Sequence, residues 1–325
     1  MKLTRRAFTV ALAAGAIARP SIVRAAGEPL TVGFVPANAI YWDLHIAIEK
    51  GYFSSAGFDP QPNVMQSSPH SIQQAIAGTY QIAASQPEPF VAAVSRGADR
   101  LAAIAAPMNR ADWYLNVQKD ITQISGLKGK IIGVSALRNS EIWLTNLLLE
   151  KGGLKKGDVD FLVVGTSPQK VAALHKGSIA GSVLFQPSAQ LAVSLGFPAV
   201  AWYDGLRPYP SILYVVNKDW AAKNENDVRA ATAIAKAHDW LWNPANKAEA
   251  IAILMKSTKR DQAIIETVYD EYFVSRKIYS RTGSVEVAGL TSALHDMAED
   301  GEIVKAPAPV AARFLLEREL GGMWS

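Results

Sequence analysis

Residues 30–51, LTVGFVPANAIYWDLHIAIEKG, contain the pattern that predicts the fold of this 325-residue chain. A β-rich run over 30–35 leads into the loop 36–41, and 43–50 then has the apolar spacing of a helix that Gly51 would end. The same order of strand, loop and helix recurs to about residue 205. Further strands are expected at 61–65, 82–85, 101–106, 130–135, 161–164 and 182–185. Strands that alternate with helices of this length predict parallel α/β sheets.

Two short matching segments divide the chain. Val117-Gln-Lys-Asp120 and Val216-Asn-Lys-Asp219 each end a β-rich run, and they lie 99 residues apart. Matching strands that bracket a second set of α/β units predict a second lobe inserted into the first, although a four-residue match is also compatible with coincidence. Beyond residue 220 the chain is expected to be mostly helical. The expected organisation is a leader over 1–25, a first lobe over 27–117 and 213–325, and a second lobe over 118–212.

The charges are distributed unevenly along the chain. The 33 Lys and Arg against 29 Asp and Glu give a net charge of +4, which by itself is compatible with a nucleic-acid partner. Five of these cations, and no acidic residue, lie in the first 25 residues: Lys2, Arg5, Arg6, Arg19 and Arg24. Without them, 28 basic side chains face 29 acidic ones, a net charge of −1. No basic cluster remains, so we expect no nucleic-acid partner.

The first 25 residues have the features of an export leader. Thr4-Arg5-Arg6-Ala7-Phe8 resembles the twin-arginine export motif, the run over 7–18 is mildly apolar, and Val23-Arg24-Ala25 fits a small-residue cleavage site. The apolar run is shorter than the roughly 20 residues that a transmembrane helix needs. We expect export to the periplasm by the twin-arginine route, with an ordinary Sec signal as the alternative.

Signals for covalent chemistry and metal binding are weak. The chain has no cysteine, which excludes disulfides, thiolate zinc sites, iron–sulfur clusters and cysteine nucleophiles. It has no H-E-x-x-H, no G-x-S-x-G, no Walker loop and no G-x-G-x-x-G. We therefore expect a binding protein rather than an enzyme, with no catalytic residues, no bound metal and no cofactor.

Four junctions between a strand and a helix share one chemistry, a Ser or Gln immediately before Pro. They are Ser68-Pro69, Gln86-Pro87, Ser167-Pro168 and Gln186-Pro187. Helix N-termini at the carboxyl ends of parallel strands direct N–H groups into a shared crevice, which is where open α/β sheets bind ligands. The simpler interpretation of any single junction is a good helix cap. For the set as a whole, the pattern favours a ligand site.

Other candidate ligand residues lie in the loops that follow strands. Tyr41 and Trp42, beside Asn38, offer aromatic faces for an organic ligand, although Trp42 would also suit the core of the lobe. Arg138, with Asn139 and Ser140, could hold a carboxylate or sulfonate through two hydrogen bonds, or be solvated. Glu88 and Asp204, near the same region, could instead bind a cationic group of the ligand. The sequence therefore does not decide the charge of the ligand.

Several stretches together resemble a known family. They are Leu30-Thr-Val-Gly-Phe34, Ile46-Ala-Ile-Glu-Lys-Gly-Tyr-Phe53 with Gly57-Phe58, Leu127-Lys-Gly-Lys-Ile-Ile-Gly-Val134 and Val171-Ala-Ala-Leu-His-Lys-Gly177. In this order and spacing they resemble the periplasmic substrate-binding proteins of ATP-driven (ABC) importers, in the nitrate, sulfonate, taurine and thiamine-pyrimidine group. The resemblance covers most of residues 30–220. It implies a type II periplasmic-binding-protein fold, with two α/β lobes joined by two crossover strands and a ligand closed between them.

The resemblance also implies which loops contact the ligand. In the first lobe they fall on Asn38 to Trp42, on Ser67 and Ser68, and on Gln86 to Glu88; in the second they fall on Ser135 to Ser140 and on Gln186. One segment departs from the pattern, because relatives usually carry an Asp-Ala pair where this chain has Ala180-Gly181 after Ile179. This difference weakens any transfer of ligand identity from the family.

The expected function is capture of a small organic molecule and its delivery to an ABC permease in the inner membrane, by a protein that is a monomer. An anion such as a sulfonate or an aromatic carboxylate is the favoured ligand. The alternatives are a heteroaromatic vitamin precursor as ligand, an exported or pyrimidine-related enzyme on the same fold, and a ligand-sensing protein.

Overall fold

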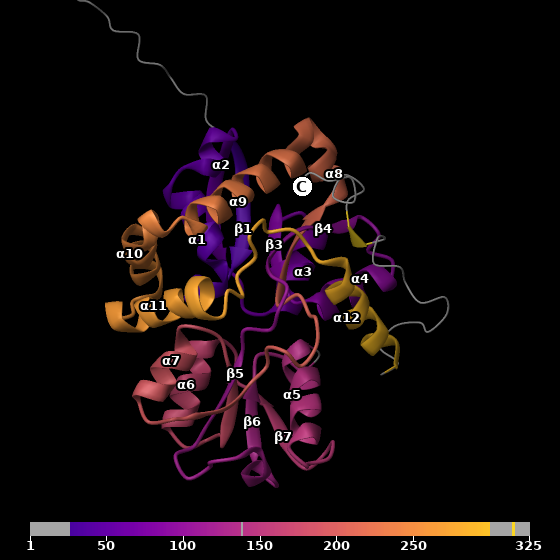
Figure 1. Ribbon diagram of the computed structural model, residues 1–325. Coiled ribbons are helices and arrows are strands. Elements are labelled where there is room, and N and C mark those ends of the chain that lie inside the picture. The colour runs from indigo at the N-terminus through magenta and orange to yellow at the C-terminus, as the bar shows by residue number, and fades with distance from the viewer. Residues whose placement is uncertain (1–26, 138, 300–313, 316–325) are drawn as a thin grey trace, which may run out of the picture.

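Two sheets of five strands each form the frame of the protein in the computed structural model, which describes residues 27–137, 139–299, 314 and 315. The first sheet has the order β2-β1-β3-β10-β4 and the second the order β7-β6-β8-β5-β9. The first is built from β1 (Glu28–Phe34), β2 (Phe58–Val64), β3 (Ile82–Ser85), β4 (Leu101–Met108) and β10 (Ile212–Asn217). The second is built from β5 (Tyr114–Val117), β6 (Ile131–Val134), β7 (Asp160–Val163), β8 (Gly181–Leu184) and β9 (Ala199–Trp202). Each sheet is the centre of one lobe (Figure 1).

The two sheets have the same topology. In each, the strand next to one edge pairs in parallel with both neighbours, β1 with β2 and β3, and β6 with β7 and β8. The next position in each is an antiparallel strand, β10 in the first sheet and β5 in the second. The sheets are therefore mixed rather than wholly parallel. In each sheet, the strand that enters directly after the chain has crossed from the other lobe runs antiparallel to its neighbours. The α/β class and the two-lobed architecture expected from the sequence are confirmed.

The chain crosses between the sheets twice, through 109–113 after β4 and through 203–211 after β9. β5 forms its hydrogen bonds with β8 and β9, so it belongs to the second sheet. The sequence placed the boundary between the lobes after residue 117, at the end of β5. In the structure the chain has already entered the second sheet before β5 begins. The leader expected over 1–25 lies outside the described residues.

Helices cover both sheets. Those of the first 200 residues are α1 (Trp42–Glu49), α2 (Tyr52–Ser55), α3 (Ser68–Ile76), α4 (Pro87–Ser95), α5 (Ser140–Lys151), α6 (Ser167–His175) and α7 (Ser188–Ser194). The later ones are α8 (Lys218–Ala222), α9 (Asn226–Trp242), α10 (Lys247–Thr258), α11 (Gln262–Tyr269) and α12 (Val287–Glu299), with a π-helical turn η5 over Asp270–Ser275. The C-terminal helices α9, α10 and α11 lie beside the first lobe (Figure 1).

Local sequence explains most of these boundaries. Gly51 ends the first helical stretch with φ +68°, a conformation that favours glycine. The strand β2 contains Pro60 and Pro62, which is tolerated because β2 is an edge strand and needs hydrogen bonds on one side only. Gly33 in β1 is required for another reason, since a Cβ there would lie 2.2 Å from the ring of Tyr80.

A buried carboxylate links the two crossover segments. Asp112 accepts a hydrogen bond of 3.0 Å from the Ser211 hydroxyl, which in turn accepts one of 2.9 Å from the indole nitrogen of Trp113. Tyr272 also donates its hydroxyl to Asp112. Burial raises the pKa of Asp112 from its usual 3.8 to about 6, although both hydroxyl hydrogen bonds lower it.

The pKa of Asp112 predicts how stability depends on pH. Between pH 4 and pH 6 the folded chain keeps a proton on Asp112 that the unfolded chain releases, so this residue contributes less to stability as the pH rises. The difference amounts to about 3 kcal/mol, at roughly 1.4 kcal/mol per unit of pKa. Chemical denaturation of Asp112→Asn should show a flatter pH profile than the wild type over this range. Asn at the exposed Asp160 should leave the profile unchanged, and equal slopes for wild type and Asp112→Asn would contradict the expectation.

Candidate functional site

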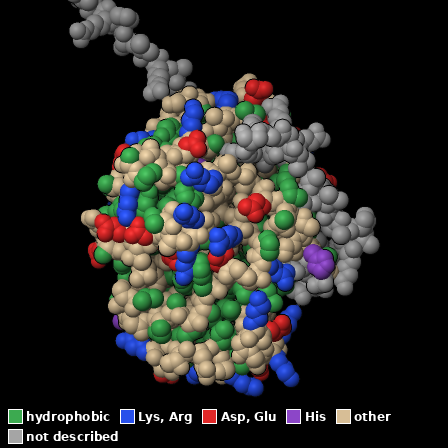
Figure 2. Space-filling model, in the orientation of Figure 1, with side chains coloured by type: hydrophobic (Ala, Val, Ile, Leu, Met, Phe, Trp, Pro, Cys, Tyr) green, Lys and Arg blue, Asp and Glu red, His purple; other side chains and the backbone are tan. Residues whose placement is uncertain are grey.

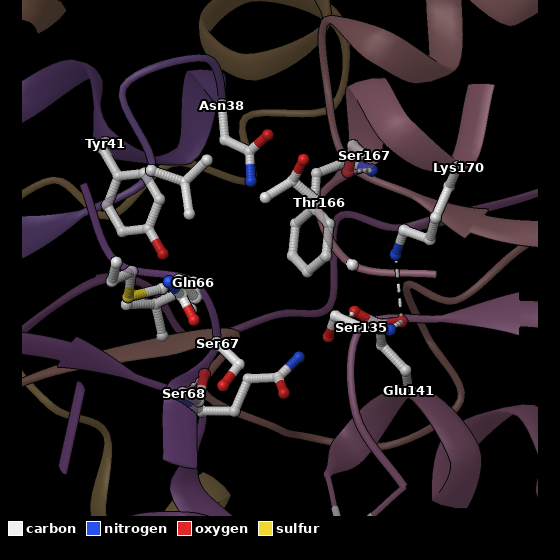
Figure 3. A pocket seen from close by; sticks show the side chains of 16 residues that line it. Asn38, Tyr41, Gln66, Ser67, Ser68, Ser135, Glu141, Thr166, Ser167 and Lys170 are labelled. Atoms are coloured by element: carbon white, nitrogen blue, oxygen red, sulfur yellow. Dashed lines mark hydrogen bonds and ion pairs between the residues drawn. The ribbon is translucent and has the colours of Figure 1, made fainter. Parts of the chain in front are cut away.

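A small cavity lies between the lobes, at the carboxyl ends of strands from both sheets (Figure 3). Its volume is about 40 Å³, and its walls come from both lobes. Six of the eleven residues predicted from the sequence line it: Asn38, Tyr41, Ser67, Ser68, Gln86 and Ser135. Four polar residues not predicted as ligand contacts line it as well: Gln66, Glu141, Thr166 and Lys170. Ser167, noted in the sequence only as part of a Ser-Pro junction, is a further lining residue.

The serines of the two Ser-Pro junctions occupy equivalent positions in the two lobes. Ser68 accepts a hydrogen bond of 3.0 Å from the backbone N–H of Gln86, and Ser167 accepts one of 3.3 Å from that of Phe185. Both bonds join residues 18 positions apart, and the two serines are themselves 99 positions apart. Each bond ties the first turn of a helix, α3 or α6, to the end of the following strand. The N-termini of α3 and α6 therefore face the same cavity, where helix dipoles favour an anion.

A buried ion pair forms part of the second-lobe wall. The Lys170 ammonium lies 3.0 Å from Oε2 of Glu141, and both side chains are 1% exposed. The Glu141 carboxylate also accepts hydrogen bonds from the backbone N–H of Ser135 at 2.9 Å and from its hydroxyl at 2.7 Å. It lies in the first turn of α5, where the helix dipole favours a negative charge. Glu141 is thus well satisfied as a carboxylate.

Lys170 is less well satisfied. Among the described residues its ammonium makes one hydrogen bond, to Glu141, although it carries three donors. The ring of Phe185, 5.7 Å from Nζ, provides the only described cation–π contact of Lys170. Burial lowers the pKa of Lys170, and the Glu141 carboxylate opposes this by raising it. The lysine can therefore offer its remaining N–H groups to a ligand in the cavity.

Two amide side chains on the first-lobe wall have unsatisfied oxygens. Asn38 Oδ1 and Gln86 Oε1 are buried and have no hydrogen-bond donor among the described residues. The Tyr41 hydroxyl, on the same wall, also points toward the cavity (Figure 3), and burial raises its pKa well above the usual value, so it stays protonated. An amide can present either its oxygen or its NH₂ group, so these three side chains can both donate and accept hydrogen bonds.

Four of the other five predicted residues lie elsewhere. Trp42 is in the core of the first lobe, where its indole nitrogen donates to the Ala250 carbonyl at 3.0 Å. Glu88 is buried at the start of α4 and accepts a hydrogen bond from Ser140 of the other lobe. Asn139 donates to the Ser135 hydroxyl at 2.9 Å, which places it behind a cavity residue. Gln186 forms an interlobe contact outside the cavity, and Arg138 is outside the described residues.

The position of Lys170 in the sequence indicates a buried, paired lysine, although it was not among the predicted ligand residues. It lies three residues after the Ser167-Pro168 junction and shares a helix face with the buried Val171 and Leu174. A lysine among apolar helix positions is buried only when it is paired, so it points to an acidic partner nearby. The partner itself could not be identified, because Glu141 lies 29 residues away on another helix.

The surface and the described helices add two observations. Basic and acidic side chains are interspersed over the face shown in Figure 2. Within residues 27–137 and 139–299, no helix combines the length and the apolar character needed to cross a membrane.

The fold and the interlobe cavity define the class of protein: a two-lobed α/β protein with a periplasmic-binding-protein fold and a cavity between its lobes. Residues 25–255 match the family model described as the NMT1-like family, and the chain belongs to this family. No relative was found among curated protein sequences.

Solved structures confirm the fold. The nitrate-binding protein NrtA from Synechocystis PCC 6803 is 15% identical, with a TM-score of 0.77 over 91% of this chain and 88% of its own. The alkanesulfonate-binding protein SsuA from Xanthomonas axonopodis pv. citri, bound to MOPS, is 15% identical, with a TM-score of 0.74 over 90% and 99%. SsuA from Escherichia coli, which binds aliphatic sulphonates, is 17% identical, with a TM-score of 0.67 over 89% and 98%. The fold expected from the sequence resemblance is therefore shared with these binding proteins.

Proposed function

We propose that this chain is the exported solute-binding protein of an ABC importer, which captures a small organic anion between its lobes and delivers it to a membrane permease. Residues 1–25 would direct it to the periplasm, by the twin-arginine route. The segments 109–113 and 203–211 would act as the hinge, and the protein would work as a monomer without catalysis. The fold shared with sulfonate- and nitrate-binding proteins supports this proposal.

The observation that carries the choice of an anion is the incompletely bonded ammonium of Lys170. It lies in the cavity wall beside the N-terminus of α6, and the N-terminus of α3 faces the cavity from the other lobe. A carboxylate, sulfonate or nitrate oxygen would satisfy the free N–H groups of Lys170 and meet the positive ends of both helices. A sulfonate or an aromatic carboxylate is the ligand we favour.

The size of the cavity limits the part of the ligand that fits. It measures about 40 Å³. A single water needs about 10–15 Å³ on this scale, so the space accommodates roughly three or four heavy atoms. That matches a carboxylate, nitrate or sulfonate head group, and a larger ligand would need the lobes to be further apart.

The test is a binding screen on the chain from residue 27 onward. Thermal shift, followed by calorimetry, should be run with nitrate, alkanesulfonates, aromatic carboxylates and pyrimidines. A true ligand at 100 times its dissociation constant should add about 2.7 kcal/mol to the free energy of unfolding. Stabilisation by an anion would support the proposal, and stabilisation by no compound of the panel would contradict it. Turnover of a stabilising compound would instead favour an enzyme.

The pyrimidines test a second candidate, a neutral heteroaromatic vitamin precursor. The observation that favours it is the pair of unsatisfied amide oxygens, Asn38 Oδ1 and Gln86 Oε1. Ring N–H or amino groups would supply the donors that these oxygens lack. Preferential binding of a pyrimidine over every anion would select this candidate.

A further inference from the structure

A contact between the lobes lies outside the ligand cavity. The π-helical turn η5 continues α11 and presents Glu271 of the first lobe to the second lobe, and α11 lies next to α7 (Figure 1). Gln186 donates its side-chain NH₂ to Glu271 Oε2 at 2.8 Å, and the Tyr114 hydroxyl donates to Oε1. The Glu271 side chain is 13% exposed, so water competes little for these bonds. Single π turns inside helices often mark functional positions.

Arg276 completes this contact from the end of the same turn. Its Nε lies 3.2 Å from Glu271 Oε1, and its guanidinium lies over the ring of Trp202. Trp202 is in turn stacked on Tyr114, with ring centroids 6.0 Å apart and an interplanar angle of 13°. Tyr114 and Trp202 belong to β5 and β9 of the second lobe. A carboxylate and a guanidinium from one lobe therefore contact an aromatic pair from the other.

Gln186 connects this contact to the ligand cavity. Its side chain binds Glu271, while its backbone carbonyl accepts a hydrogen bond of 2.7 Å from Ala39 of the first lobe. Asn38 and Tyr41, one and two positions from Ala39, line the cavity. Glu271 itself does not line the cavity; it lines a separate groove whose walls come from both lobes. Loss of the Glu271 contact would thus loosen the lobes without removing any ligand contact.

We propose that Glu271 is an interlobe latch: a positioning residue that holds the lobes together through Gln186 and Tyr114, and so sets ligand affinity without touching the ligand. The proposal rests on the proposed function, in that closure of the lobes traps a ligand. In the ligand-free chain, the latch maintains a closed population.

Protonation should tighten the latch. Burial raises the pKa of Glu271 from its usual 4.5 to about 7, with Arg276 lowering it and the carboxylate of Asp112 raising it further. The other titratable groups around it include Tyr114 of β5, Tyr272 of η5, and Asp270, which is paired with Lys247 of α10 at 2.6 Å. In an open form the exposed carboxylate would return toward 4.5, so closure takes up a proton between pH 4.5 and pH 7. The closed population should therefore rise as the pH falls from 7 to 5.

The absence of cysteine makes the latch directly measurable. Spin labels at Ala252→Cys in α10 and at Lys176→Cys, directly after α6, both exposed, would report the distance between lobes by double electron–electron resonance without ligand. Glu271→Ala should shift the distribution to longer distances. Glu271→Gln keeps an acceptor and removes the charge, so it should stay closed and lose the pH dependence. Glu266→Gln, one turn earlier on α11 and hydrogen-bonded within its own helix, is the matched control.

Ligand binding provides the second readout. Glu271→Ala should weaken affinity by about tenfold or more, mainly through faster dissociation, since it removes the hydrogen bonds from Gln186 and Tyr114, which only the closed form makes. Distance distributions of Glu271→Ala that equal those of the wild type from pH 5 to pH 8 would overturn the latch. Unchanged affinity of Glu271→Ala would overturn it as well. Because the distance measurement needs no ligand, failure of the latch is distinguishable from failure of the proposed function.

Discussion

Replacing Lys170 with methionine should abolish binding of the anionic ligand and lower the free energy of unfolding by about 3–5 kcal/mol. The stability loss follows from Glu141, whose carboxylate is 1% exposed and would lose its only described cationic partner. The loss of binding follows from the N–H groups of Lys170 that are left for a ligand. Urea denaturation at pH 7 and calorimetry with the best ligand of the screen measure the two effects.

Two further variants separate stability from binding. Lys170→Met combined with Glu141→Gln removes both charges, so it should recover most of the stability and none of the anion binding. Lys176→Met, at the exposed end of the same helix, should change stability by less than about 0.5 kcal/mol and leave binding intact. A Lys170→Met protein that binds the anion as the wild type does would exclude Lys170 as a ligand contact.

Replacing Trp42 with alanine should cost about 3–5 kcal/mol of stability, because the side chain is fully buried in the first lobe. Its ring packs against Tyr269 and Phe273, with centroids 5.8 and 5.6 Å away, and its indole nitrogen bonds to Ala250. The milder Trp42→Phe should lose stability in the same direction while the folded protein keeps its ligand affinity. Both are measured by denaturation and calorimetry.

Tyr41 offers the matched comparison, since it is the adjacent residue and its hydroxyl points into the cavity. Tyr41→Phe should weaken ligand binding with a smaller loss of stability than Trp42→Ala. The reverse pattern, with affinity lost in Trp42→Phe and kept in Tyr41→Phe, would mean that the indole rather than the phenol contacts the ligand.

Much of the fold could be predicted because it is encoded locally. The segment 30–51 forms β1 and α1 close to the expected boundaries, and Gly51 adopts the left-handed conformation that ends the helical stretch. Boundaries were less accurate where tertiary pairing overrides local preference. The strand expected at 61–65 begins instead at Phe58, since pairing with β1 keeps the chain extended through two prolines at a sheet edge.

The site was predictable in part for the same reason. Ser68, Gln86 and Ser135 were found because each lies at or near the junction that follows a strand, and the carboxyl ends of parallel strands meet at one edge of a sheet. Tyr41 and Trp42 could not be told apart in the sequence. They are adjacent on one turn, and the residues that enclose Trp42, on α10, α11 and η5, come more than 200 positions later.

The sequence by itself determined the order of strands and helices, the helix starts at the Ser-Pro and Gln-Pro junctions, and the resemblance to importer-binding proteins. These properties depend on residues within a few positions of one another, or on segments whose order is fixed by the chain. Tertiary structure alone decided that Lys170 pairs with Glu141 in the cavity wall, and that Gln186 binds Glu271 of the other lobe outside this cavity. Both contacts join side chains from separate elements. Their energy depends on burial and on distances of about 3 Å, which exist only once the lobes have folded and closed.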